Sequence, residues 1–573
     1  MRSSKRLPSV RQSPGARGQP RSVSRRSLLR GALLGGATVV ASAAAVPDAS
    51  LAGDRLLAAP LAQGASRTLT LVTNRAPSDL DPHSAYDAGS GVLMQGPFEG
   101  LIRAKANTTD EFMPVLAESW EASADESVWT FRLRDGVTFQ DGTPLDAPAA
   151  RASFERLLTL GLAPSTVLGR FLTDPAQVTA ADRGTLVFDL GRPQPLFETA
   201  LASAYGTAIV NTAALQDHEV DGDWGHAWAQ TSSEGLGTGP YRLVEFDVET
   251  GAVLERYDGY WRRWESEQFD RVILRVVVEP ETRRALIESG DADIATTLPL
   301  ATVGELEQHP DLAVDHRYSL TVRYIAMTVA GPLQSPEARQ ALCWAFPYDE
   351  VISGVYDGFA KRAIGPMAEL CRGFSSDTFV YQTDLQRARA LLDRAGIVEG
   401  TVLTMLLPPG NTETAVTAEL FQANLAAVGL TLDIRPVDFA TYVSIFTGDL
   451  PAEERPNLLP SFWSPDYNDG WNHLWPQISC DAWQSGNGGH YCNERVEELL
   501  EQARNAAGEE SYLSSLKEIQ QIVTRDDPAA IYYAQPEWLT VLRRDIDGFT
   551  PDLVVGDLVD FYALHRREPQ GVA

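Results

Sequence analysis

Cysteine is scarce in this sequence of 573 residues, which has four cysteines and none before Cys343. No C-x-x-C pair occurs, and no two of the eight histidines are four residues apart. Zinc ribbons, iron–sulfur clusters and haem attachment sites depend on such pairs, so we expect neither a resident metal ion nor a cofactor. A lipid-modified cysteine near the N-terminus is not expected either.

Apolar runs long enough to cross a bilayer are also missing, because the run at Gly31–Val40 is too short. A basic stretch without Asp or Glu precedes this run, and A-x-A patterns follow it up to Ala45. This layout predicts a cleavable export signal at residues 1–45, and Ser24–Arg30 resembles a twin-arginine export motif. Residues 46–66 are predicted to be a flexible leader, and the mature protein is expected in the periplasm or outside the cell.

Positive charge is in short supply, with 48 Lys and Arg against 77 Asp and Glu. Nine of the cationic residues lie in the first 45 positions, so the remainder carries 39 − 77 = −38. Such a body repels phosphate backbones, which excludes nucleic acid as a partner. An acidic surface also serves solubility, so this charge does not identify a cationic ligand.

The order of expected elements is typical of an α/β protein. The apolar strand Val272–Val278 is followed by a helix at Pro280–Ser289, and strands at Val402–Leu407 and Leu430–Val437 flank a helical pattern at Thr414–Val428. The apolar content of 44% is that of a globular protein, and the length predicts two or more lobes.

Several motifs together resemble the extracytoplasmic solute-binding proteins of oligopeptide, dipeptide and nickel ABC importers (bacterial solute-binding protein family 5). The likeness covers about residues 66–568. Its segments, in chain order, are Pro114–Trp120 with Trp129–Pro144, Gly237–Arg242, Asp258–Trp261, Gly290–Ile294, Ala338–Leu342, Ala388–Gly396 and Trp463–Asp469.

The resemblance implies a two-lobe periplasmic-binding-protein fold with two crossing segments, near Arg317–Tyr324 and Ala529–Trp538. Lobe I would comprise residues 67–322, with an extra subdomain at 99–228, and residues 533–568 would return to it. Lobe II would comprise residues 323–532. The implied function is that of a monomeric substrate-binding component, which captures a di- to oligopeptide between the lobes and delivers it to the permease subunits of an ABC transporter.

The segment Trp463–Asp469 supplies the main candidate site. In peptide-binding relatives the matching Asp pairs with the ligand ammonium, which assigns that role to Asp466, with Trp463 and Tyr467 as walls. Further candidates are Asp469 in the same segment and, by position after the first strand, three residues of lobe I: Asp81, Tyr86 and Ser90.

Departures from the family pattern leave the ligand class open. Gly470 stands where Pro is usual, and Pro347 interrupts the helix that usually continues there. The alternative is therefore the same fold with a non-peptide solute, such as an opine-like amine, an oligosaccharide or a metal chelate.

Four cysteines in an exported chain allow three disulfide connectivities. Cys480 and Cys492 enclose a short glycine-containing loop, and closing such a loop is worth about 3 kcal/mol. We predict Cys480–Cys492 and, by elimination, Cys343–Cys371.

Catalytic patterns give little support to an enzyme. No G-x-S-x-G elbow occurs, and Ser514-x-x-Lys517 lacks the S-D-N and K-T-G partners of penicillin-binding enzymes. A carboxylate pair for glycoside hydrolysis cannot be read from sequence spacing. We expect a protein that binds its ligand without turning it over.

Overall fold

The computed structural model describes residues 67–567 except 106–107, 109, 409–411, 449, 484, 507 and 557. The predicted export signal at 1–45 and the leader at 46–66 lie outside the described residues. Within the described part, no helix combines the length and the apolar character that crossing a membrane requires.

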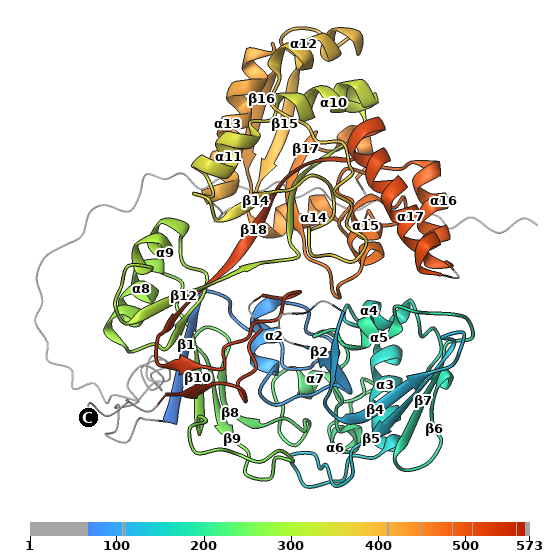
Figure 1. Ribbon diagram of the computed structural model, residues 1–573, viewed down its shortest axis with the longest axis vertical. Helices are drawn as coiled ribbons and strands as arrows, with labels where there is room; N and C mark the ends of the chain where they lie inside the picture. Colours follow the sequence, from blue (N-terminus) through green and yellow to red (C-terminus); the bar gives the residue numbers. More distant parts are fainter. Residues whose placement is uncertain are drawn as a thin grey trace, which may run out of the picture. The chain divides into compact units, whose positions relative to one another are not determined.

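A mixed sheet forms the backbone of the fold (Figure 1). Its strands run in the order β16 (Thr431–Pro436), β15 (Val402–Leu407), β17 (Leu458–Trp463), β13 (Val322–Met327), β18 (Ala530–Arg543), β11 (Ile294–Ala295), β1 (Thr68–Thr73), β10 (Arg271–Val276), β9 (Gly251–Arg256) and β8 (Tyr241–Asp247). β12 (Leu312–Tyr318) and β14 (Ala360–Arg362) also pair with β18.

The long strand β18 is shared by two sets of strands. Its first half pairs with β13 up to Arg323↔Ala534, and its second half pairs with β12 from Tyr318↔Glu537 onward. Between the halves, the Ser319 hydroxyl donates to the Pro536 carbonyl at 3.0 Å, and the Gln535 amide donates to the Ser319 carbonyl at 2.8 Å. These side-chain hydrogen bonds bridge the gap between the β13 and β12 pairings, and β14 pairs with β18 at the same residues, 534–536.

A four-stranded sheet stands apart from the shared sheet, in the order β4 (Ala117–Ala122), β5 (Val128–Leu133), β7 (Thr185–Asp189) and β6 (Val178–Ala180). Helix α3 (Ala147–Leu160) packs on it through Phe154, whose ring centroid lies 5.1 Å from that of Phe188. Two short strand pairs complete the sheets: β2 (Ile102–Ala104) with β3 (Phe112–Pro114), and β19 (Ile546–Asp547) with β20 (His565–Arg566).

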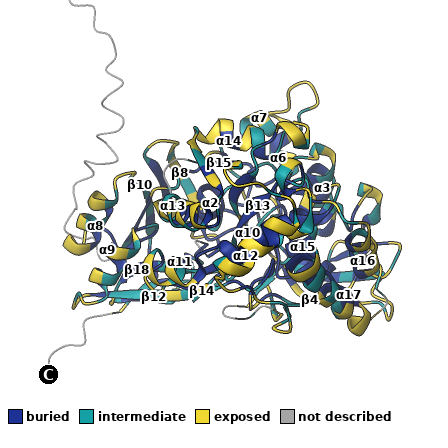
Figure 2. Cartoon of the chain, turned by 90° about the horizontal axis from the view of Figure 1, so that it is seen from above, coloured by how far each residue is buried: buried dark blue, intermediate teal, exposed yellow. Residues whose placement is uncertain are grey.

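The helices cover the sheets with their apolar sides inward (Figure 2). Pro347 follows the end of α10 (Pro336–Ala345), as its missing N–H predicts. Besides α3, the α-helices are α2 (Ala88–Met94), α4 (Ser165–Gly169), α5 (Phe197–Leu201), α6 (Thr212–Gln216), α7 (His226–Ala229), α8 (Pro280–Ser289), α9 (Leu300–Leu306), α10 (Pro336–Ala345), α11 (Tyr348–Gly354), α12 (Leu385–Arg394), α13 (Thr412–Ala427), α14 (Phe439–Phe446), α15 (Gly470–Ile478), α16 (Glu494–Arg504) and α17 (Glu509–Gln521).

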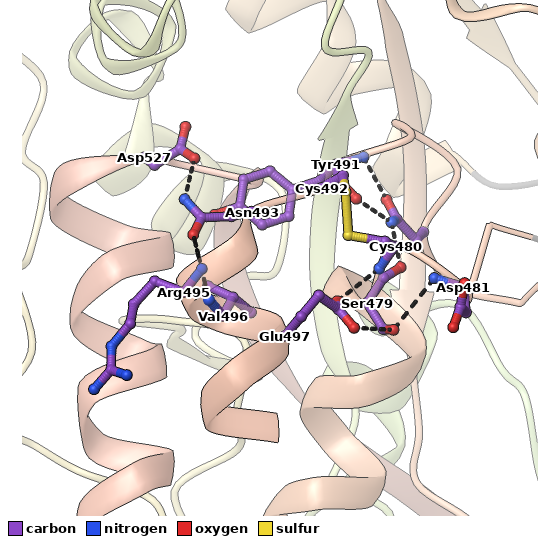
Figure 3. The surroundings of a disulfide bond; sticks show 11 residues. Ser479, Cys480, Asp481, Tyr491, Cys492, Asn493, Arg495, Val496, Glu497 and Asp527 are labelled. Atoms are coloured by element: carbon purple, nitrogen blue, oxygen red, sulfur yellow. Dashed lines mark hydrogen bonds between the residues drawn. A yellow bond between two sulfur atoms is a disulfide. The ribbon is translucent and has the colours of Figure 1, made fainter. Parts of the chain in front are cut away.

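One disulfide prediction is confirmed. Cys480 and Cys492 are bonded, with their Cα atoms 4.6 Å apart (Figure 3). Glu497 on α16 supports the bridge, because its carboxylate accepts from the Cys480 N–H at 2.7 Å and from the Ser479 hydroxyl at 3.2 Å. The bridge therefore ties the loop after α15 to the start of α16.

The other disulfide prediction, Cys343–Cys371, was wrong. Both cysteines are free and buried, and burial raises the pKa of each thiol. Cys343 lies on α10 in one apolar cluster, whereas Cys371 lies in another cluster together with Met367 and Leu516. Each thiol packs as a small apolar group in its own core. Pairing the two cysteines that remained after Cys480–Cys492 was therefore incorrect.

Candidate functional site

Asp466 lies in the loop between β17 and α15, where segments from distant parts of the chain meet. The Tyr86 hydroxyl donates to its Oδ1, and the Asn472 amide donates to its Oδ2 at 3.3 Å. The main chain of Asp466 is held too, since its N–H donates to the Asn472 side chain at 2.7 Å and its carbonyl accepts from the Ser203 hydroxyl at 2.8 Å. The carboxylate is thus fixed by neutral donors.

The environment of Asp466 disfavours its negative charge. Burial raises the pKa of the Asp466 carboxyl above its ordinary value, and the hydrogen bonds from Tyr86 and Asn472 only partly oppose this effect. No salt bridge to Asp466 is found among the described residues. A desolvated carboxylate without a positive partner is suited to binding a cation from outside.

Tyr86 was predicted as a contact from lobe I, and the structure brings it to Asp466. It precedes α2, and its ring packs edge-on against Tyr205 with the centroids 5.0 Å apart. The residue is 40% exposed, so Tyr86 lies on the solvent-accessible side of the surroundings of Asp466.

A cavity of about 180 Å³ opens beside Asp466. Its lining comes from the end of α2, the β2–β3 pair, the stretch after α5 and residues 550–555, 558 and 560, in addition to Asp466, Tyr467 and Asn468. The predicted carboxylate therefore lies at the edge of a space large enough for part of a ligand.

The two predicted aromatic walls have different positions. Tyr467 lines the cavity, and its hydroxyl accepts from Arg170 at 3.2 Å. Trp463 is not part of the lining, because its indole N–H donates to the Asn472 carbonyl at 3.0 Å and its ring packs beside Gly486. Trp463 therefore packs against the segment at 466–472 outside the cavity lining.

Asp469 has a structural position. It is fully buried, and its Oδ1 accepts from the Trp471 and Asn472 N–H groups at 2.9 and 3.3 Å as the N-cap of α15. The Tyr512 hydroxyl donates to its Oδ2 at 2.5 Å. Both oxygens accept hydrogen bonds within the fold, so Asp469 fixes the start of the helix that carries Asn472.

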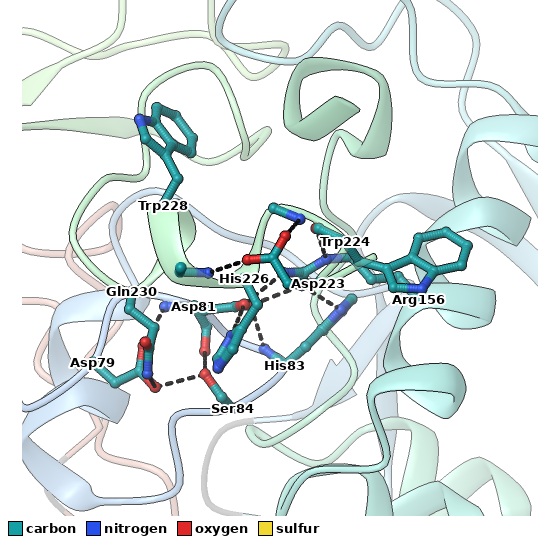
Figure 4. Close-up of polar contacts among 12 residues, drawn as sticks. Asp79, Asp81, His83, Ser84, Arg156, Asp223, Trp224, His226, Trp228 and Gln230 are labelled. Carbon is teal, nitrogen blue, oxygen red and sulfur yellow. Dashed lines mark hydrogen bonds and ion pairs between the residues drawn. The ribbon is translucent and has the colours of Figure 1, made fainter. Parts of the chain in front are cut away.

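Asp81 is the centre of a buried ion network (Figure 4). Arg156 donates to its two oxygens at 2.9 and 2.6 Å, and His226 contacts it at 2.9 Å. Burial alone would raise the pKa of Asp81, but these hydrogen bonds hold it well below its ordinary value. Burial also lowers the pKa of the neighbouring His83 to about 4. This network joins the loop after β1 to α3 and α7.

Ser90 is likewise structural, since its hydroxyl accepts from the N–H groups of Ser78 and Asp79 at 2.9 and 3.1 Å. It fixes the loop that leads to Tyr86. Asp81 and Ser90 therefore hold the segment that carries Tyr86, and neither is part of the cavity lining.

Two residues that contact Asp466 were not predicted from the sequence. Asn472 contacts Asp466 from the first turn of α15, and its place six residues after Asp466 could have drawn attention to it. Ser203 comes from a stretch more than 260 residues away along the chain, and no local pattern marks it.

Comparisons with known proteins identify the family and the fold of the chain. The sequence profile of the bacterial extracellular solute-binding proteins, family 5 (middle region), matches residues 111–485, more than half of the chain. The probable D,D-dipeptide-binding periplasmic protein DdpA of Escherichia coli (strain K12) is 28% identical over 507 residues, 86% of this chain and 93% of that protein. The di/tripeptide-binding protein 2 of Pseudomonas aeruginosa (strain UCBPP-PA14) is 26% identical over 513 residues, 85% of this chain and 93% of that protein.

Solved structures share the fold. The periplasmic binding protein DppA from Helicobacter pylori, in complex with the peptide STSA, has a TM-score of 0.75 at 23% identity, covering 88% of this chain and all (100%) of that one. The substrate-binding protein CtaP from Listeria monocytogenes has a TM-score of 0.77 at 21% identity, covering 87% of this chain and 99% of that one. The predicted α/β, two-lobe periplasmic-binding-protein fold is confirmed, and the chain belongs to the bacterial extracellular solute-binding proteins, family 5.

Proposed function

We propose that this protein is the peptide receptor of an ABC importer, and that Asp466 binds the α-ammonium of the peptide. The observation that carries the proposal is the Asp466 carboxylate, which is desolvated at the edge of a cavity and bonded only to neutral donors. An ammonium would supply both the missing charge and short charge-assisted hydrogen bonds. Peptide binding by similar proteins, including DdpA and the di/tripeptide-binding protein 2, supports the same ligand class.

The peptide would be captured between a lobe I of residues 67–322 plus 533–568 and a lobe II of residues 323–532. Residues 319–321, which connect β12 to β13, and residues 535–536, which lie between the two halves of β18, would absorb the hinge motion. The receptor acts as a monomer, performs no chemistry on the peptide, and presents the closed form to the permease.

Export would follow the twin-arginine route, on the strength of Arg25 and Arg26 before the apolar run. Replacing both with Lys should leave an uncleaved precursor in the cytoplasm, which fractionation would detect. Normal export of that variant would contradict this route.

Titration calorimetry with matched ligands tests the role of Asp466. The wild-type protein, stripped of bound ligand by unfolding and refolding, is titrated with free and N-acetylated di- to pentapeptides. Free peptides should bind and acetylated ones should not. Asp466→Asn should weaken binding of free peptides about 10- to 100-fold, since a hydrogen bond to a charged group is worth about 1.5–3 kcal/mol.

Asp258→Asn is the control, because that side chain is 89% exposed and pairs with Arg256 at 3.0 Å. It should bind as the wild type does. Equal binding of free and acetylated peptides would refute the role of Asp466, and no binding of either would move the ligand class to a non-peptide solute.

A further inference from the structure

We propose that a small cavity between α10, β14 and β18 binds a monoatomic anion such as chloride, and that Arg362 and Tyr532 hold this ion (Figure 1 shows the three elements). The inference goes beyond the proposed function, because this cavity shares no lining residue with the one beside Asp466. It therefore makes no assumption about the ligand that the protein transports.

The size of the cavity restricts its guest to a single heavy atom. Its volume is about 20 Å³. A space of about 10–15 Å³ is enough for one water-sized guest, so a carboxylate, a sulfate ion or a peptide does not fit. The described residues that line the cavity include no Asp or Glu, and the charged residue among them is Arg362. The lining is thus positive, in a chain with 77 acidic and 48 basic residues.

Tyr532 on β18 supplies one unpaired hydrogen-bond donor. The residue is 6% exposed, and its hydroxyl has no hydrogen-bond partner in the described part of the chain. Leaving a buried hydroxyl without a partner costs free energy, because the group has lost its hydration and gained nothing in return. An acceptor inside the cavity would remove this cost.

Arg362 at the end of β14 supplies a second unpaired donor. Its Nη2 donates to the Tyr381 carbonyl, and its guanidinium carbon lies 3.9 Å from the centroid of the Tyr348 ring. Its Nε–H is buried and has no partner among the residues that the structure describes. The same guanidinium therefore holds β14 in place and keeps one donor for a guest in the cavity.

The charge of Arg362 also lacks a close counterpart. Burial lowers the pKa of Arg362 below its ordinary value, and the carboxylate of Asp349 opposes this effect without forming an ion pair with Arg362 in the described ranges. A guanidinium nevertheless keeps its charge in a protein. A buried charge is stabilised by a partner of opposite sign, which an anion in the cavity would provide.

The remaining polar groups of the lining favour an anion over a water molecule. Cys343 contributes a thiol that stays protonated, because burial raises its pKa, and the Thr524 hydroxyl already donates to the Gln520 carbonyl at 2.7 Å. The groups without a partner are thus a guanidinium N–H and a hydroxyl, with the thiol as a weak donor. A water molecule would bring two protons that need acceptors, whereas a halide ion only accepts.

Anomalous scattering from bromide locates the ion. Crystals of the mature protein in sodium bromide should show an anomalous peak inside the cavity, within hydrogen-bond reach of Arg362 Nε and of the Tyr532 hydroxyl. Peaks at other positions only, or density for a water molecule in the cavity, would overturn the inference.

Urea unfolding tests whether the ion also binds in solution. Chloride replaces gluconate, an anion too large for the cavity, at constant ionic strength, so that screening stays the same. If the folded protein alone binds chloride, its unfolding equilibrium constant should be about 11-fold smaller at a chloride concentration of ten times Kd. Equal stability in the two salts would overturn the inference.

Variants assign this effect to the cavity. A hydrogen bond to a charged group contributes about 10-fold or more to affinity, so Tyr532→Phe should reduce the 11-fold effect to about 2-fold. Arg362→Gln removes the charge and should abolish the effect. Tyr562→Phe is the matched control, because its hydroxyl donates to the Arg263 carbonyl at 2.6 Å outside the cavity lining, and it should keep the full effect. A chloride effect that is unchanged in Tyr532→Phe would overturn the placement of the site.

Discussion

The disulfide Cys480–Cys492 provides a quantitative test of how the loop beside the site is held. Replacing both cysteines with serine removes a crosslink between residues separated by 12 positions. In the chain-entropy description, a closed loop of this length restricts the unfolded chain by an amount worth about 3 kcal/mol at 25 °C. The free energy of unfolding should therefore fall by about 3 kcal/mol in the double variant.

The folded loop should survive this change, because hydrogen bonds hold it independently of the bridge. The Tyr324 hydroxyl on β13 donates to the Gly486 carbonyl at 2.8 Å, and Arg455 donates to the Gly488 carbonyl at 3.1 and 2.9 Å. Since the effect acts on the unfolded chain, ligand affinity should change by less than about 2-fold.

Urea unfolding followed by circular dichroism measures the loss, with the wild-type protein plus reductant as the matched comparison. Reductant should lower the stability of the wild type to that of the variant and leave the variant unchanged. Alkylation in denaturant should label two thiols of the oxidised wild type, Cys343 and Cys371, and four after reduction. A stability loss below about 1 kcal/mol would refute the entropic reasoning.

Two other side chains give further predictions. Arg156→Met leaves the fully buried Asp81 carboxylate without its main partner, so the free energy of unfolding in urea should fall by about 3–5 kcal/mol. Adding Asp81→Asn should restore part of this loss. A loss below about 1 kcal/mol in Arg156→Met would contradict the buried ion pair. His473 is fully buried, and burial lowers its pKa from 6.5 to about 4, so the unfolded chain binds a proton that the folded chain refuses between these pH values. The wild type should therefore lose stability relative to His473→Phe as the pH falls from 6.5 toward 4, by up to about 1.4 kcal/mol per pH unit, and parallel pH profiles would contradict this assignment.

The sequence was sufficient for the fold, and it led to a carboxylate that lines a cavity in the structure. The order of elements predicted an α/β protein, and the segment around Asp466 led to a residue that the structure places at the edge of a cavity. Tyr86 was proposed from its position after the first strand, and the structure brings its hydroxyl to Asp466. These features could be predicted because the type of each element and a short motif depend on residues that are close together in the sequence.

Contacts between distant segments could not be predicted in the same way. Asp81 and Tyr86 are close in sequence, but Asp81 is bound by Arg156, which lies 75 residues away on α3. The count of cysteines predicted a second disulfide, whereas burial in separate cores keeps Cys343 and Cys371 apart. The partner that a side chain finds depends on tertiary packing, which spacing does not encode.

In the proposed receptor, the charge of Asp466 would also connect peptide binding with closure of the lobes. The carboxylate is desolvated where its loop meets Tyr86 and Ser203, and an ammonium there would favour the closed form over an open, hydrated one. Because the pKa of Asp466 is raised, its ionisation destabilises this unliganded arrangement increasingly as the pH rises through that pKa. Asp466→Asn removes the penalty, so at pH 7.5 the unliganded variant should be more stable than the wild type and have a smaller radius of gyration by X-ray scattering. If the variant is less stable than the wild type, or if its radius of gyration equals that of the wild type, closure is governed by groups other than this carboxylate.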